Sequence, residues 1–344
     1  MKQRILVSLA VASALAGGLF AGTANAETVL RWNNWLPPGH SQLVGVMTPW
    51  FKQVEEATKG SVKIVPTDSS LGAPPRQYDL AIDGVADVVL GISGYTPGRF
   101  KLVPIAELPL LSESGEARGV ALWRVYKKYF EQANEFSDVV LLGLYSGTPG
   151  SIMTGKKPVA TLADYNGLKM RVGGGMMNEV NQALGGVNVA VPAGQIYELL
   201  SQGVADGTLM GGEGYDSFKL TKVVNYVTTV PGGMYGSVWY IAMNKAAFEK
   251  LSKEEQDAIM SVSGESIASL GGGVFDAAEK VGREHMKADG VQFTVADEAF
   301  IGAIRDSTKF LTDQWLADAQ TLGVDGPAAL AMYQEETKKL DKPM

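Results

Sequence analysis

The order of apolar and polar positions along the chain predicts short strands that alternate with helices. Apolar residues at every second position, or in short continuous runs, indicate strands, and apolar residues three or four positions apart indicate helices. The first part contains strands at 28–32, 61–66 and 86–91, with helices at 43–54 and 76–83 between them. This succession is typical of a parallel sheet wound with helices, where ligands bind at the carboxyl ends of strands. Asn34, Trp35 and Tyr95 follow two such ends and are candidate binding residues.

A second strand–helix succession repeats the first. It has strands at 168–172, 187–191 and 207–210, helices at 176–184 and 193–202, and a glycine-rich turn at 211–214 that includes Glu213. The segment YDLAIDGVAD at 78–87 is echoed by YELLSQGVAD at 197–206. A chance match is the alternative for the motif alone, but both copies also precede an apolar strand and a glycine-rich turn. We therefore predict two similar α/β lobes that face a cleft.

The strand at 168–172 ends in a candidate anion-binding arginine. A period of two puts Leu168, Met170 and Val172 on one face and Lys169 and Arg171 on the other. Three glycines follow at 173–175, where a backbone without side chains lets a ligand come close. A guanidinium at this position can form two parallel hydrogen bonds to a carboxylate. The alternative is an ordinary surface arginine beside a flexible loop.

The last part predicts an aromatic strand and a long helix. The strand at 234–244 places Tyr235 and Trp239 on one face. We expect Asn34, Tyr95, Glu213 and Tyr235 to supply hydrogen bonds, and Trp35 and Trp239 to supply apolar walls; a structural role is the alternative for each. The helix at 252–289 begins with a capping box of Ser252 and Glu255. The glycines at 271–273 interrupt it, so a break between two helices is an alternative. Further helices are predicted at 296–317 and 327–339.

The N-terminus and the composition restrict the class of protein. Residues 1–26 combine Lys2 and Arg4, an apolar run and an Ala-Asn-Ala cleavage site, which predicts an export signal peptide. Its removal takes the basic residues from 30 to 28 against 37 acidic ones, so the mature formal charge is 28 − 37 = −9. That charge disfavours nucleic acid as a partner. No later window is apolar enough to span a membrane, and the absence of cysteine excludes disulfides and thiolate metal sites.

Motifs for catalysis are missing from the sequence. The chain has two histidines, His40 and His285, and neither an HExxH nor a GxSxG motif. It has no phosphate-binding loop, and the glycines at 173–175 do not continue into a dinucleotide fingerprint. We therefore predict no metal, no cofactor and no enzymatic activity, although an unfamiliar enzyme would also lack these motifs.

The segment at 164–211, which contains DYNGLKMRVGGG and GVADGTLMG, resembles the solute-binding subunits of TRAP transporters, the tripartite ATP-independent periplasmic uptake systems. Shorter matches at 72–87, 95–100, 107–109 and 245–259 extend the resemblance over nearly the whole mature chain. The resemblance implies a two-lobed α/β periplasmic binding protein fold with crossover strands and a long helix bracing both lobes. It also implies that Arg171 clamps a substrate carboxylate. The second arginine of many members is absent from 151–157, which disfavours a sialic-acid-like or C4-dicarboxylate ligand.

The resemblance gives a complete working hypothesis. Lobe I would comprise 27–149 plus about 236–270, lobe II 150–235 plus about 271–330, and the tail 331–344 would pack on both. The protein would be a periplasmic monomer that captures a small organic acid, hydroxylated or aromatic, and delivers it to the small and large membrane subunits. The alternatives are a sensory or ABC-type binding protein, which neighbouring genes would reveal, and a cofactor-free periplasmic enzyme, which would turn its ligand over.

Overall fold

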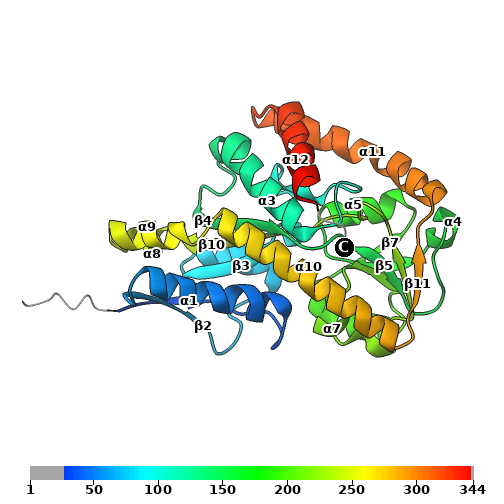
Figure 1. The fold of residues 1–344 in the computed structure, drawn as a ribbon, viewed down its shortest axis with the longest axis horizontal. Coiled ribbons are helices and arrows are strands. Elements are labelled where there is room, and N and C mark those ends of the chain that lie inside the picture. Colours follow the sequence, from blue (N-terminus) through cyan, green and yellow to red (C-terminus); the bar gives the residue numbers. More distant parts are fainter. Residues whose placement is uncertain (1–26, 342–344) are drawn as a thin grey trace, which may run out of the picture.

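The chain forms two β-sheets surrounded by helices (Figure 1). The structure is a computed structural model that describes residues 27–341, so the predicted signal peptide at 1–26 lies outside the described residues. The first sheet has the order β2 (Val62–Pro66), β1 (Thr28–Trp32), β3 (Val88–Ile92), β10 (Val238–Asn244), β4 (Val139–Ser146). The second has the order β11 (Gln292–Val295), β9 (Tyr226–Thr229), β5 (Ser151–Thr154), β8 (Gly207–Met210), β6 (Lys169–Val172), β7 (Val187–Ala190).

Both sheets are mixed, because the chain crosses from one to the other and back. Strands β2, β1 and β3 are parallel, as are β7, β6 and β8, whereas β10 and β5 run antiparallel to their neighbours. Residues 147–150 join β4 to β5, and 230–237 join β9 to β10. These two connections lie side by side, since Gly147 N–H donates to Ser237 O at 2.9 Å and Gly150 N–H donates to Tyr235 O at 3.2 Å. The predicted two-lobed fold with crossover segments is confirmed; the exact lobe boundaries stay a prediction.

Helices pack on both sheets and account for most of the remaining chain. They are α1 (Thr48–Ala57), α2 (Gln77–Ile82), α3 (Gly115–Val125), α4 (Leu162–Tyr165), α5 (Met176–Ala183), α6 (Ile196–Ser201), α7 (Glu213–Ser217), α8 (Lys245–Glu249), α9 (Lys253–Ser261), α10 (Glu265–Ala288), α11 (Glu298–Thr321) and α12 (Gly326–Leu340). Two π-helical segments, Leu43–Met47 and Tyr126–Phe130, extend α1 and α3. No helix in residues 27–341 has the length and apolar character needed to cross a membrane.

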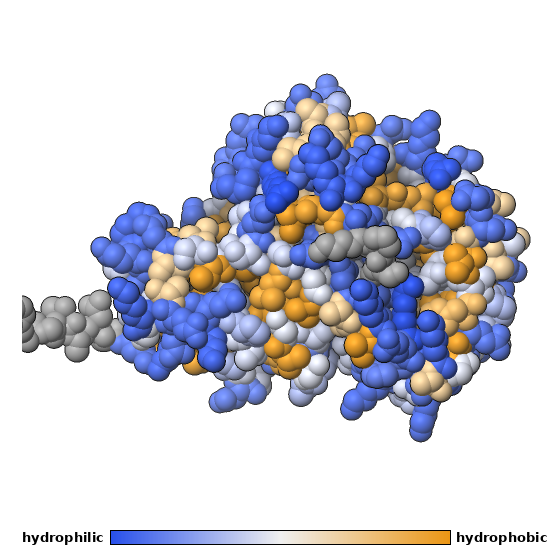
Figure 2. All heavy atoms as spheres, viewed as in Figure 1, coloured by the Kyte–Doolittle hydropathy of each residue, from blue (hydrophilic) through white to orange (hydrophobic). Residues whose placement is uncertain are grey.

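Helix α10 crosses the front of the molecule from the first lobe to the second (Figure 1). The predicted helix at 252–289 is in fact two helices, because the chain turns at Gly264 with φ +67° between α9 and α10. The alternative break at 271–273 is wrong, since α10 continues through it. Gly271 lies against the Tyr145 ring and Gly272 against the Gly115 backbone, so these glycines let the helix approach β4 and α3 closely. The face that carries α10 is mostly hydrophilic, with separate hydrophobic patches (Figure 2).

The repeated sequence corresponds to a repeated structure. In the first copy, the Asp87 carboxylate accepts the Arg31 N–H at 2.8 Å, and Asp87 N–H donates to Arg31 O at 2.9 Å. In the second copy, Asp206 makes the same two bonds to Lys169, at 3.0 and 2.7 Å. Each aspartate therefore fixes the strand beside its own, β1 or β6. This equivalence places Asn33 and Arg171 at matching positions, at the carboxyl ends of the two strands.

Candidate functional site

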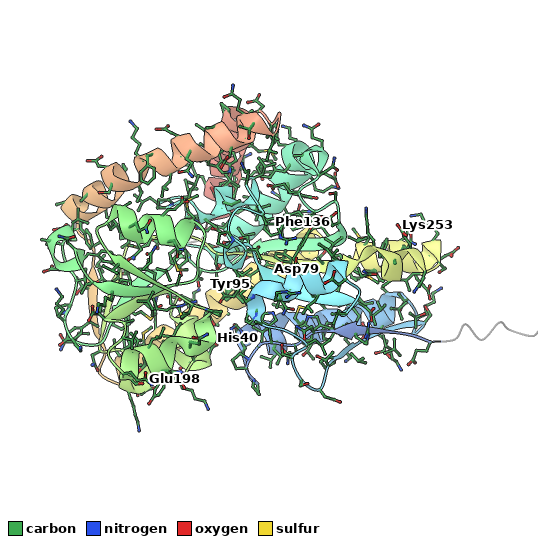
Figure 3. All side chains as sticks on the ribbon, turned by 180° about the vertical axis from the view of Figure 1, so that it is seen from behind. His40, Asp79, Tyr95, Phe136, Glu198 and Lys253 are labelled. Atoms are coloured by element: carbon green, nitrogen blue, oxygen red, sulfur yellow. The ribbon has the colours of Figure 1, made fainter. Side chains whose placement is uncertain are left out.

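A cavity of about 80 Å³ lies between the two lobes. Its lining includes six of the seven binding residues predicted from the sequence: Trp35, Tyr95, Arg171, Glu213, Tyr235 and Trp239. Figure 3 shows Tyr95 and His40 where the two lobes meet. Asn34 does not line the cavity; its side-chain oxygen accepts the N–H of Leu36 at 3.0 Å and fixes the turn that orients Trp35. The structure thus brings together side chains that are up to 204 positions apart in the sequence, from Trp35 to Trp239.

Arg171 is buried at the end of β6, with 2% of its surface exposed. Its Nε donates to Val191 O at 2.9 Å. Within residues 27–341, no carboxylate lies within 4.0 Å of the guanidinium, and neither Nη group has a hydrogen-bond partner. A buried arginine is normally paired, because an unpaired charge away from water is costly. The two free Nη groups therefore form a site that an anion can occupy with two parallel bonds.

Tyr95 borders the same part of the cavity as Arg171. A Cβ atom at Gly173 would lie 3.4 Å from the Tyr95 ring and 3.5 Å from Arg171 Nη2. The Tyr95 hydroxyl accepts the Ala193 N–H at 3.1 Å, which leaves its own proton free to donate. The Tyr235 hydroxyl, in contrast, donates its proton to Leu209 O at 2.9 Å, so it can only accept a hydrogen bond from a ligand. Burial raises the pKa of Tyr235, which remains a neutral phenol.

A continuous series of aromatic rings forms one wall of the cavity. The Tyr95 ring lies edge-on to Trp35 with centroids 6.2 Å apart, and Trp35 stacks on Trp239 at 5.9 Å with an interplanar angle of 14°. Trp239 contacts His40 at 6.2 Å, and His40 contacts Phe218 at 5.7 Å. Rings in such offset and edge contacts present flat apolar surfaces on which another ring can stack.

Two buried carboxyl groups also line the cavity. Burial raises the pKa of Glu213 to about 7, against the opposing effect of the Ser217 hydroxyl, which donates at 3.1 Å. The Ser41 hydroxyl also donates to Glu213, at 3.5 Å. Burial likewise raises the pKa of Glu107 to about 7, although the Ser93 hydroxyl donates to it at 2.5 Å.

Helix α10 holds the loop that carries Glu213. The buried Glu279 carboxylate accepts the Gly212 N–H and also the Arg283 Nε–H, the latter at 2.6 Å. Gly282 packs directly on the Gly212 carbonyl oxygen. The helix that crosses both lobes therefore positions a cavity residue through its neighbour.

Glu107 and His40 are cavity residues that the sequence reasoning missed. Glu107 is the single acidic residue in the apolar run VPIAELPLL at 103–111, and a lone acid in such a run is a usable signal of a buried polar site. His40 belongs to no metal-binding or catalytic motif in the sequence. Burial lowers its pKa to about 4, so it is neutral at physiological pH.

The lobes are in contact around the cavity. The backbone at Gly94 packs against Gly174 and Gly175, so closely that side chains at these positions would overlap the facing backbone. The Ala193–Tyr95 and Ser41–Glu213 hydrogen bonds also join the two lobes. The structure is therefore a closed arrangement. In residues 27–341, no group of three or more potential ligands could hold a metal ion.

Two lobes closed on a cavity with an unpaired cation define a solute-binding protein. Comparison with known families agrees, because a model for the bacterial extracellular solute-binding proteins of family 7 matches residues 33–318. The chain belongs to this family, which confirms the resemblance to TRAP solute-binding subunits.

Similar proteins cover nearly all of the chain. Outer membrane transporter protein TsaT of Comamonas testosteroni is 31% identical over 333 residues, 95% of this chain and 97% of that protein. A TRAP solute-binding protein of Bordetella bronchiseptica, solved with bound (R)- and (S)-mandelate, has a TM-score of 0.89 and 38% identity, covering 91% of this chain and 100% of that chain. A marine metagenome TRAP protein specific for aromatic acid ligands, solved with 3-hydroxybenzoate, has a TM-score of 0.85 and 30% identity, covering 92% and 100%.

Proposed function

We propose that this chain captures a small aromatic monocarboxylic acid in the interlobe cavity and delivers it, unchanged, to the membrane subunits of a TRAP transporter. The observation that carries the proposal is Arg171, a buried guanidinium with two free Nη groups at one end of a wall of stacked rings. A carboxylate can bind the guanidinium while its ring stacks on Trp35 or Trp239.

The residues around Arg171 favour one carboxylate on the ligand. Arg171 is the single arginine or lysine that lines the cavity in the described chain, and two carboxyl groups, Glu107 and Glu213, line it as well. A second ligand carboxylate would face these acids without a cation of its own. Two similar solved proteins bind mandelate and 3-hydroxybenzoate, both aromatic monocarboxylates, which supports the same class here.

Ligand binding and lobe closure are coupled in this proposal. In the closed form an empty site leaves the Arg171 charge buried and unpaired, whereas in an open form water would solvate it. A carboxylate therefore stabilises the closed form more than the open one, and this difference drives closure. The predicted signal peptide at 1–26 would direct the protein to the periplasm, where we expect it to act as a monomer.

The proposal is tested by titrating the protein with benzoate, mandelate, cyclohexanecarboxylate and succinate in a calorimeter. We expect the aromatic acids to bind more tightly than the saturated ring or the dicarboxylate. Arg171→Met should weaken benzoate by about 100-fold or more, because it removes the charged partner of a buried carboxylate. The apo melting temperature should change little.

The matched control is Lys169→Met, which removes a cation from the same strand but leaves the cavity lining intact, since Lys169 is exposed. This control should bind like the wild type. Unchanged benzoate affinity in Arg171→Met would contradict the role of Arg171, and release of a modified product would contradict binding without conversion.

A further inference from the structure

The cavity contains two polar atoms that the protein leaves without partners, on His40 and Glu213. Oε2 of Glu213 accepts the hydroxyl protons of Ser217 and Ser41, at 3.1 and 3.5 Å. No residue in the described range 27–341 donates a hydrogen bond to Oε1 of the same carboxyl group. Both side chains line the cavity, and Ser41, the residue after His40, is the one that bonds this carboxyl group.

The hydrogen bond that His40 accepts indicates which of its ring nitrogens carries the proton. Its Nδ1 accepts the Gln42 N–H at 3.2 Å, so in the neutral ring the proton resides on Nε2. Burial lowers the pKa of His40 to about 4, which keeps the ring neutral. Nε2–H has no acceptor among the residues that the structure describes. The cavity lining therefore offers one hydrogen-bond donor, on His40, and one acceptor, on Glu213.

We propose that His40 and Glu213 together bind a hydroxyl group of the ligand, so that the protein selects hydroxylated aromatic monocarboxylates over the unsubstituted acids. A hydroxyl group both accepts and donates, and can use the His40 donor and the Glu213 acceptor at the same time. A hydrogen, methyl or halogen substituent would leave both buried polar atoms unpaired, which is costly. A carboxylate would be repelled by Glu213. The inference rests on the proposed function, because Arg171 must first anchor the acid.

The aromatic wall separates this pair from Arg171. From Tyr95, which borders Arg171, ring contacts pass to Trp35, then to Trp239 and then to His40. A ring stacked along this wall with its carboxylate on Arg171 extends toward His40 and Glu213. The residues that recognise the carboxylate and the residues that recognise the hydroxyl are therefore different, and substitutions can test them separately.

The experiment measures Kd for benzoate and for 2-, 3- and 4-hydroxybenzoate at pH 8, where Glu213, with a pKa of about 7, is ionised. The wild type should bind at least one hydroxylated acid about tenfold or more tightly than benzoate, since a hydrogen bond to a charged group has that effect. Glu213→Gln and His40→Phe should each reduce this preference to about threefold or less.

The control is Asp216→Asn, on the same short helix as Glu213. The Asp216 carboxylate pairs with His285 at 2.8 Å, and neither residue lines the cavity. This variant should keep the wild-type preference. An equal preference in wild type and both substituted proteins, or equally tight wild-type binding of all the acids, would overturn the inference and leave the proposed function intact. Failure of every aromatic acid to bind the wild type would overturn both.

Discussion

Glu107 should make the stability of the protein depend on pH through the lobe contact. The residue is 4% exposed and accepts a hydrogen bond from the Ser93 hydroxyl at 2.5 Å, and its carboxyl group lies near the backbone of Val238, at the start of β10, and of Gly175 and Met176, at the start of α5. It therefore touches both lobes. Burial outweighs the hydrogen bonding and raises the pKa to about 7.

The sign and the size follow from proton linkage. A raised carboxyl pKa means that the folded state binds the proton more tightly than the unfolded state, whose pKa is about 4.3. The stabilisation is complete below that value and is lost as the pH rises to about 7. With 1.36 kcal/mol for each pKa unit, the free energy of unfolding should fall by about 4 kcal/mol across this window because of Glu107 alone.

Glu107→Gln isolates this contribution, because glutamine imitates the protonated carboxyl group. Its amide N–H₂ can donate to Ser93 Oγ, whose own proton can go to Val238 O at 3.3 Å. The free energy of unfolding is measured by urea denaturation of both proteins at pH 5, 6, 7 and 8. At pH 8 the variant should be more stable relative to the wild type than at pH 5, by about 2.5 kcal/mol, the part of the window that lies above pH 5.

Subtracting the unfolding free energy of the wild type from that of Glu107→Gln at each pH cancels the contributions of other groups that titrate in the same range, such as Glu213. Ser93→Ala is a second check. It deletes a hydrogen bond that lowers the Glu107 pKa. In Ser93→Ala the fall in unfolding free energy with pH should therefore extend to higher pH than in the wild type. A stability difference between Glu107→Gln and wild type that does not change from pH 5 to pH 8 would refute the reasoning.

Two further predictions concern the packing of helix α10 and the hydrogen bonds of the buried Arg118. Gly282→Ala should destabilise the protein by about 1–3 kcal/mol in urea denaturation, because its Cβ would overlap the Gly212 oxygen. Gly273→Ala, in the same helix but facing open space, should stabilise it by about 0.5–1 kcal/mol; equal effects would contradict the packing of α10. Arg118→Met should cost about 3–5 kcal/mol, because the buried guanidinium donates to four carbonyl oxygens, those of Ala106, Leu108, Ser112 and Gly232; a loss below 1 kcal/mol would contradict this role.

The sequence predicted the features that local patterns determine. A period of two placed Arg171 at the end of a strand, and the structure confirms β6 with Met170 and Val172 fully buried. The capping box of Ser252 and Glu255 is present at the start of α9. The repeated GVAD motif identified two units because its aspartate fixes the neighbouring strand in each of them.

The features that were missed depend on tertiary packing. Burial raises the pKa of Glu107, and the segments packed around it, at helix α5 and strand β10, lie far from it in the sequence, so no local pattern reports its burial. The continuity of α10 through three glycines depends on the surfaces of Tyr145 and Gly115, against which side chains would not fit. Without those surfaces, helix propensity alone favours a break at the glycines.

Under the proposed function, the stretch at 168–175 would combine ligand binding and lobe closure in one piece of backbone. Arg171 presents the cation, and three residues later Gly174 packs against Gly94 of the other lobe. Of the three glycines expected to admit a ligand, Gly173 and Gly174 line the cavity, while Gly174 and Gly175 also allow the two backbones to meet. A carboxylate that binds Arg171 therefore lies close to the contact that closes the lobes. Carboxylate binding and lobe closure would then be coupled through three residues of backbone, from Arg171 to Gly174.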